Sequence, residues 1–245
     1  MASEAPVAPS VLPIGSETFS SAMMDARNYM NWVLDPFRSR IGKRVLEIGM
    51  GHGGYADHLP HLEDYTGLDI ASDLVEGLQK LHPDRHYVCA DATDPHLSSS
   101  LGGKTYDTVL CLNVLEHIEN DKMAIQGMLS TLEKGGHLML FVPAYQSLYS
   151  EMDRLAGHFK RYRRQDFSEL LKGLPATVVE SAYFNSLGGF GWWINKIHKP
   201  KTLNDNAVNT QLALFDKYLV PVAKGLDVFT RSFFGQSLVI IIRKD

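Results

Sequence analysis

The sequence has few cysteines, no long apolar run and no block of like charges. Cys89 and Cys111 are its two cysteines, which excludes a disulfide framework and favours a reducing compartment. No apolar stretch reaches the roughly 18–20 residues of a transmembrane helix. The 24 basic and 28 acidic side chains give a net charge of −4, and no basic tract indicates nucleic-acid binding. We therefore expect a cytoplasmic protein without a transmembrane segment that acts in small-molecule metabolism.

The beginning of the sequence lacks the features of a secretion signal, namely a basic start followed by a continuous apolar core. We expect residues 1–18 to form a disordered tail. The hydrophobic fraction of 44% is ordinary for a chain that buries a full core. Residues 19–245 are therefore expected to form a single domain.

From Lys43 onward, short β-branched apolar segments alternate with longer amphipathic segments, which predicts an α/β fold with a parallel sheet. The expected strands are 44–48, 64–68, 86–89, 105–112, 137–142, 177–184 and 237–243. The expected helices are 55–62, 72–81, 94–101, 117–132, 165–174 and 207–229. The segments 143–164 and 185–206 have no regular period and are rich in aromatic residues, so we expect them to form a small cap over a ligand.

A glycine-rich turn follows the first expected strand. Read literally, Gly49, Gly51 and Gly54 satisfy the dinucleotide fingerprint G-x-G-x-x-G, and Asp69 lies about 20 residues on, where a ribose-binding acid is expected. Glu47 argues against a dinucleotide, because a carboxylate ~4 Å from a pyrophosphate would cost on the order of several kcal/mol. A cationic ligand such as S-adenosylmethionine is favoured, and NAD remains the alternative.

The string E-x-G-x-G-x-G, formed by Glu47, Gly49, Gly51 and Gly53, resembles motif I of the class I S-adenosylmethionine-dependent methyltransferases. Later segments resemble further motifs of that family in the same order. The resemblance implies a Rossmann-like, mostly parallel sheet of seven strands, with the last strand antiparallel and helices on both faces. It also implies S-adenosylmethionine as the cofactor and S-adenosylhomocysteine as the product.

The same resemblance implies roles for individual residues. Asp69 would hold the ribose hydroxyls with Ile70 against the adenine, and Asp91 would meet the adenine amino edge, although both acids could instead cap helices. Tyr29 would close over the methionyl end, with core packing as the alternative. The cofactor-binding candidates are Tyr29, Glu47, Gly49, Gly51, Gly53, Asp69, Ile70, Asp91, Ala92, Asn113 and His117.

The acceptor side is expected in the cap. A string G-H-x-x-R-Y after the fifth expected strand resembles a methyltransferase type 11-like branch often encoded near sugar-transferring enzymes. His158 would act as a base or orient the substrate, with a structural histidine bonded to the backbone as the alternative, and it forms the catalytic prediction together with Tyr162. Arg161 would hold an anionic acceptor or form an ion pair with Glu151 or Asp153.

Four more residues complete the predicted acceptor site, namely Tyr145, Tyr149, Asn185 and Trp193. The glycines and tryptophans near residue 190 are consistent with a lid over an apolar acceptor or with a homodimer interface. A third interpretation is a surface contact for a lipid-linked acceptor, made by a small basic cluster. The residues of that cluster are Lys196, His198, Lys199 and Lys201.

No metal is expected. Catechol-methylating relatives use an Asp after the fourth strand and a later Asp-Asn pair, where this chain has Asn113 and Phe184-Asn185. The predicted function is transfer of a methyl group from S-adenosylmethionine to an oxygen, nitrogen or carbon of a small molecule, by in-line displacement. The alternatives are an NAD-dependent oxidoreductase and a non-catalytic module on the same fold.

Overall fold

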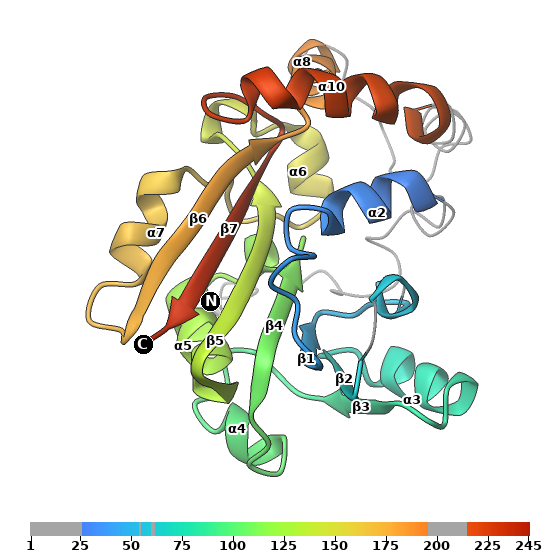
Figure 1. The fold of residues 1–245 in the computed structure, drawn as a ribbon, viewed down its shortest axis with the longest axis vertical. Helices are drawn as coiled ribbons and strands as arrows, with labels where there is room; N and C mark the ends of the chain where they lie inside the picture. The colour runs from blue at the N-terminus through green and yellow to red at the C-terminus, as the bar shows by residue number, and fades with distance from the viewer. Residues whose placement is uncertain (1–25, 54, 60–61, 196–214) are drawn as a thin grey trace, which may run out of the picture.

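One sheet organises the described part of the molecule. The structure is a computed structural model and describes residues 26–53, 55–59, 62–195 and 215–245. Seven strands pair in the order β3-β2-β1-β4-β5-β7-β6 (Figure 1). They are β1 (Arg44–Ile48), β2 (Asp64–Asp69), β3 (His86–Cys89), β4 (Tyr106–Leu112), β5 (Leu132–Pro143), β6 (Ala176–Phe184) and β7 (Ser237–Lys244).

Strand direction decides which residues meet at the edge of the sheet. β1 to β5 pair with one another in parallel, whereas β7 is antiparallel to both β5 and β6. The expected Rossmann-like sheet with an antiparallel last strand is therefore confirmed. The carboxyl ends of β1, β2 and β4 lie at one edge, and because β7 runs the other way, its first residue, Ser237, pairs with Pro143 at that same edge.

Helices cover both faces of the sheet. One face packs against α4 (Leu97–Ser100), α5 (Asp121–Thr131) and α7 (Arg164–Leu170), and the other against α2 (Arg27–Leu34), α3 (Ser72–Leu81) and α10 (Val220–Thr230). The remaining helical segments are η2 (Ala56–His58), η3 (Leu115–His117), η4 (Gln146–Leu148), α6 (Glu151–Leu155), α8 (Ser186–Asn195) and the π-helix η5 (Phe215–Leu219). None of the helices within the described residues is long and apolar enough to cross a membrane.

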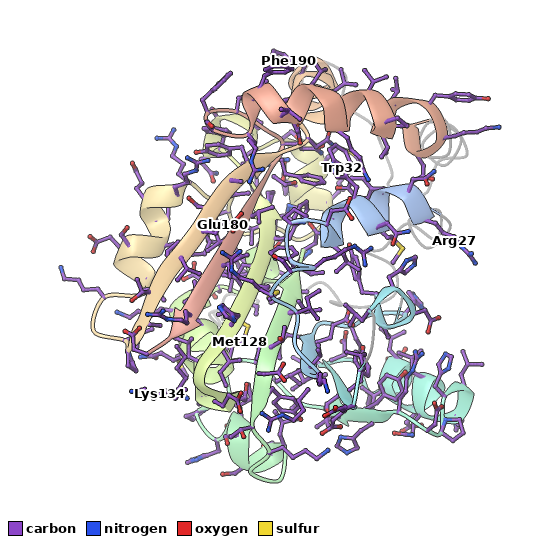
Figure 2. All side chains as sticks on the ribbon, viewed as in Figure 1. Arg27, Trp32, Met128, Lys134, Glu180 and Phe190 are labelled. Atoms are coloured by element: carbon purple, nitrogen blue, oxygen red, sulfur yellow. The ribbon has the colours of Figure 1, made fainter. Side chains whose placement is uncertain are left out.

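Side chains along the central strands point alternately to the two faces of the sheet and so form the two halves of the core. In β4, Val109 and Cys111 belong to the cluster under α5, while Leu110 belongs to the cluster under α2. Trp32 of α2 is labelled in Figure 2. Its ring packs against that of Phe184 at the end of β6, with centroids 4.1 Å apart. Both faces of the sheet are therefore buried, which holds the carboxyl-end edge rigid.

Several predicted helices differ from the observed ones. The helix expected at 117–132 begins at Asp121, because the Asn120 side chain accepts a hydrogen bond from the Met123 N–H and caps it. Within the described part of 55–62, the chain forms η2. The helix expected at 94–101 shortens to α4, and within the described part of 207–229 the chain forms η5 and α10.

The two segments expected to be irregular contain helices α6 and α8. α8 begins at the carboxyl end of β6 beside α10 (Figure 1). The Asp227 carboxylate of α10 accepts hydrogen bonds from the backbone N–H groups of Asn185 (2.6 Å) and Ser186 (2.9 Å), which satisfies the start of α8. The predictions for residues 1–18 and for the basic cluster at 196–201 lie outside the described residues.

Candidate active site

A cavity of about 610 Å³ opens at the edge where the parallel strands end. This is the location where open α/β sheets bind their ligands. Its wall combines the turn after β1, the ends of β2 and β4, helix α2 and the loop that follows α6. The predicted site residues in this wall are Tyr29, Gly49, Gly51, Asp69, Ile70, Asp91, Ala92, Asn113, His117, His158 and Arg161.

The turn after β1 brings the backbone to the cavity. Gly49 has a φ of 67° and Gly51 a φ of 54°, a region that favours glycine. A Cβ on Gly49 would lie 2.3 Å from Val114 Cγ2, so this position also requires glycine for space. Gly53 has a φ of 77° but packs toward Leu78 and is not among the residues of the cavity wall.

Two acids stand at neighbouring strand ends. Asp69 accepts hydrogen bonds from the N–H groups of Gly51 (2.9 Å) and Ala71 (3.0 Å), so one carboxylate fixes both the glycine turn and the start of α3. Asp91 accepts from the N–H and hydroxyl of Thr93, both at 2.8 Å. Ile70 is 52% exposed at the cavity, an apolar surface that a planar ring would cover.

Glu47 lies behind the turn and not in the cavity wall. Its side chain is 2% exposed, and the Tyr65 hydroxyl donates a hydrogen bond of 2.7 Å to its carboxylate. Burial raises the pKa of Glu47 to about 7, although the hydrogen bond from Tyr65 opposes this effect. Any attraction between Glu47 and a cationic ligand would therefore act from beneath the turn, without direct contact.

Helix α2 and the end of β4 supply the middle of the wall. The Tyr29 ring lies 6.4 Å from that of Phe184, centroid to centroid, so this residue both packs on the core and faces the cavity. Asn113 has a φ of 55°, a left-handed conformation that asparagine tolerates, and its N–H donates to Phe141 O at 2.8 Å. Burial and the nearby charge of His158 lower the pKa of His117 to about 4, which keeps this ring neutral.

A hydrogen-bonded network fixes the loop that brings His158 and Arg161 to the cavity wall. His158 Nδ1 lies 2.9 Å from Asp153 Oδ1, and Arg161 donates to both oxygens of Asp153 at 2.8 and 3.1 Å. Of the two predicted roles of Arg161, the ion pair with Asp153 is the one the structure contains. Burial alone would raise the pKa of Asp153, but the hydrogen bonds from His158 and Arg161 hold it below its ordinary value.

The other acceptor-site predictions fall away from the cavity wall. Tyr162 is fully buried, and its hydroxyl donates to Leu115 O (3.1 Å) and lies 3.2 Å from Asp121 Oδ2, so it is a core residue. The Tyr149 hydroxyl donates to His158 O at 2.7 Å and braces the loop that carries this histidine. Aromatic residues of an irregular segment can face either way, so sequence alone does not separate those in the cavity wall from those in the core.

Tyr145 and Asn185, both predicted for the acceptor site, make packing contacts instead of lining the cavity. The Tyr145 hydroxyl bonds Phe233 O and its ring stacks on Tyr183 with centroids 4.8 Å apart. The Asn185 side chain donates to Gln236 at 3.0 Å and is 2% exposed. The Trp193 side chain lies outside the described residues.

Three polar residues of the wall stand out among those that sequence reasoning missed. Glu116, 1% exposed, lies between the predicted Asn113 and His117, and burial raises its pKa to about 7. Gln236 and Ser237 enter the wall because the antiparallel β7 starts where the other strands end. The predicted reversal of the last strand was a sufficient signal to find these two.

Comparison with known proteins decides the family. Residues 23–181 match the model of a family described as "Methyltransferase domain". The chain belongs to this methyltransferase family. It is 29% identical over 114 residues to the ubiquinone biosynthesis O-methyltransferase of Vibrio cholerae, covering 44% of this chain and 45% of that protein. The chain thus spans about half the length of the Vibrio cholerae relative that it matches.

Two further similarities extend over most of the chain. The ubiquinone biosynthesis O-methyltransferase of Shewanella pealeana is 23% identical over 224 residues, covering 88% of this chain and 84% of that protein. The structure of the plantazolicin methyltransferase BpumL in complex with SAH superposes with a TM-score of 0.51 at 16% identity, covering 92% of this chain and 84% of that one. The fold is therefore that of the class I S-adenosylmethionine-dependent methyltransferases.

The residues in the wall fit the family's methyl donor. A glycine turn, two strand-end carboxylates and an exposed apolar side chain offer places for the methionyl group, the ribose, the adenine amino edge and the adenine face. The match to the methyltransferase family overturns the alternative of an NAD-dependent oxidoreductase.

Proposed function

We propose that this chain catalyses transfer of the methyl group of S-adenosylmethionine to a small organic acceptor, releasing S-adenosylhomocysteine. One observation carries this proposal: a single cavity is lined by the family's glycine turn, two strand-end acids and His158, whose Nδ1 is held by Asp153. Bound S-adenosylmethionine supplies an already activated methyl group, so the protein's main tasks are orientation and exclusion of water.

On the donor side, Asp69 accepts hydrogen bonds from the two ribose hydroxyls while still holding the turn. Ile70 and Ala92 cover the adenine, and Asp91 accepts from its amino edge. Gly49 and Gly51 allow the methionyl part to approach the backbone closely.

On the acceptor side, Asp153 holds Nδ1 of His158 and thereby sets the orientation of the ring. Nε2 of His158 then meets the acceptor, either orienting it or taking its proton. Arg161 supports this pair through Asp153 and need not touch the acceptor itself. The string G-H-x-x-R-Y thus combines one residue that faces the acceptor with two that hold the loop, which supports assignment to the type 11-like branch.

The remaining proposals concern the whole chain. We assign residues 19–245 to one methyltransferase domain with cap segments at 143–164 and 185–206. The first segment supplies His158 and Arg161 to the cavity wall, whereas the described part of the second supplies none of its residues. The free cysteines support a cytoplasmic location. Phe229 of α10 is 78% exposed beside Val228 at 69%, a surface that supports either a homodimer or a lipid-linked acceptor. Light scattering of the purified chain, with and without phospholipid vesicles, distinguishes these two.

Calorimetry tests the donor site. Wild-type protein should bind S-adenosylhomocysteine with a micromolar Kd. Asp69→Ala should lower this affinity at least about 10-fold, because two charge-assisted hydrogen bonds disappear. Asp73→Ala is the matched control, since Asp73 is an exposed carboxylate in the first turn of α3 outside the cavity wall. Wild-type protein that prefers NADH to S-adenosylhomocysteine would overturn the proposal.

A further inference from the structure

Three potential metal ligands meet in the wall of the cavity. Glu116 and His117 belong to η3, directly after β4, and His158 belongs to the loop after α6. One ligand atom from each lies within 4.8 Å of the others, and all three residues line the cavity. Segments 41 residues apart in sequence therefore bring two imidazoles and one carboxylate to a single point.

Both histidines are held in the way that metal-binding histidines usually are. His158 places Nδ1 2.9 Å from the carboxylate of Asp153, which leaves Nε2 directed toward Glu116, 4.0 Å from its Oε1. His117 is hydrogen-bonded to the backbone of Gly157. A carboxylate or backbone partner on one ring nitrogen fixes the tautomer and presents the other nitrogen to an ion.

The third residue has an atom that lacks a partner. Glu116 is 1% exposed, and its Oε2 has no hydrogen-bond partner within the described part of the chain. A buried carboxylate oxygen without a partner is unfavourable, and a cation in the cavity would supply one. Because Arg161 compensates the charge of Asp153, the carboxylate of Glu116 contributes the negative charge that such an ion would balance.

We propose that Glu116, His117 and His158 bind one divalent transition-metal ion, such as Zn²⁺, at the acceptor side of the cavity. Two imidazoles and one carboxylate suit Zn²⁺, Co²⁺ or Fe²⁺ better than Mg²⁺, which prefers oxygen ligands. Ligands at about 2.0–2.2 Å from an ion lie closer together than the present 4.0 Å between Nε2 and Oε1, so the side chains must close in by a small rotation.

The coordination sphere would remain open toward the cavity, because three protein ligands leave a position for a further oxygen. On the basis of the proposed function, this position would hold an acceptor oxygen, and the ion would favour its deprotonated form. Nε2 of His158 would then be a ligand and not a base. No metal was expected from the sequence because Asn113 and Asn185 stand where the catechol-methylating relatives have their metal-binding acids. Neither residue belongs to the three ligands proposed here.

Titration with Zn²⁺ and Co²⁺ tests the site without any substrate. The full chain, treated with a chelator and dialysed, should bind one equivalent of Zn²⁺ by calorimetry, and Co²⁺ should give visible absorption bands of a nitrogen- and oxygen-ligated ion. Glu116→Gln and His158→Gln should each weaken Zn²⁺ binding at least 10-fold. His96→Gln removes an exposed histidine outside the cavity wall and should leave binding unchanged.

A further variant tests the carboxylate that holds the ring of His158. Asp153→Asn keeps all three ligands but changes the partner of His158 Nδ1, and should weaken Zn²⁺ about 10-fold or more. Glu116→Gln should keep the unfolding temperature of the wild type and its affinity for S-adenosylhomocysteine. Failure of the metal site and failure of the donor site are therefore distinguishable. The proposal would be overturned if the wild type does not bind Zn²⁺, or if Glu116→Gln and His158→Gln bind Zn²⁺ as tightly as the wild type does.

Discussion

Glu47 should make the stability of the folded chain fall as pH rises through neutrality. Burial is the main cause that raises its pKa from 4.5 to about 7, against the opposing hydrogen bond from Tyr65. Between these two values the folded chain binds a proton at Glu47 that the unfolded chain releases. The stabilisation is therefore fully present below about pH 4.5 and is lost as pH rises through 7.

The size of this effect follows from the two pKa values. Their difference, from 4.5 to about 7, corresponds to roughly 3 kcal/mol at about 1.4 kcal/mol per pH unit. Glu47→Gln removes the titration while keeping an oxygen that accepts the Tyr65 hydroxyl. The variant should therefore gain about 3 kcal/mol of stability over the wild type on going from pH 4.5 to 8.

Urea unfolding of both proteins at pH 4.5, 6 and 8 measures this difference directly. Other buried acids, such as Glu116, titrate in both proteins and cancel in the comparison. Parallel pH profiles for the wild type and Glu47→Gln would refute the reasoning, since Glu47 would then have the same pKa in the folded and unfolded chains.

Three further predictions concern the cap and the turn. Asp153→Ala should destabilise the fold by about 3–5 kcal/mol in urea unfolding, because the guanidinium of Arg161 is left buried without this carboxylate; a loss below 1 kcal/mol would contradict the buried pair. Tyr162→Phe removes one buried hydroxyl and should cost about 1–2 kcal/mol, with unchanged S-adenosylhomocysteine affinity by calorimetry; weakened affinity would return Tyr162 to the site. Gly49→Ala places a Cβ against Val114 at a positive φ and should lower that affinity at least about 10-fold, whereas an unchanged Kd would show that the turn tolerates a side chain.

The strands were predictable because local pattern decides them. Leu110 and its neighbours in β4 are apolar on both faces, which is typical of a parallel strand buried between two helical layers. The strand-end residues of the donor side followed from the sheet: once β1 and β2 are placed in parallel, Gly49 and Asp69 must lie at the same edge. Their place in the cavity wall could therefore be predicted from the sequence.

The acceptor side was less predictable because long-range contacts decide it. The start of α8 is satisfied by Asp227, a partner more than 40 residues away, and nothing in the local sequence indicates this contact. Within the string G-H-x-x-R-Y, His158 faces the cavity while Tyr162 faces the core. No periodicity distinguishes the two in an irregular segment, so only the folded chain separates the residue that faces the cavity from the one that faces the core.

A crystal structure of the chain with S-adenosylhomocysteine tests the central claim most directly. The account predicts that the ribose hydroxyls lie within hydrogen-bond distance of the Asp69 carboxylate, the adenine packs on Ile70, and the sulfur faces the side of the cavity that holds His158. Binding in the reverse orientation, with the adenine against His158, or binding outside this cavity, would contradict it.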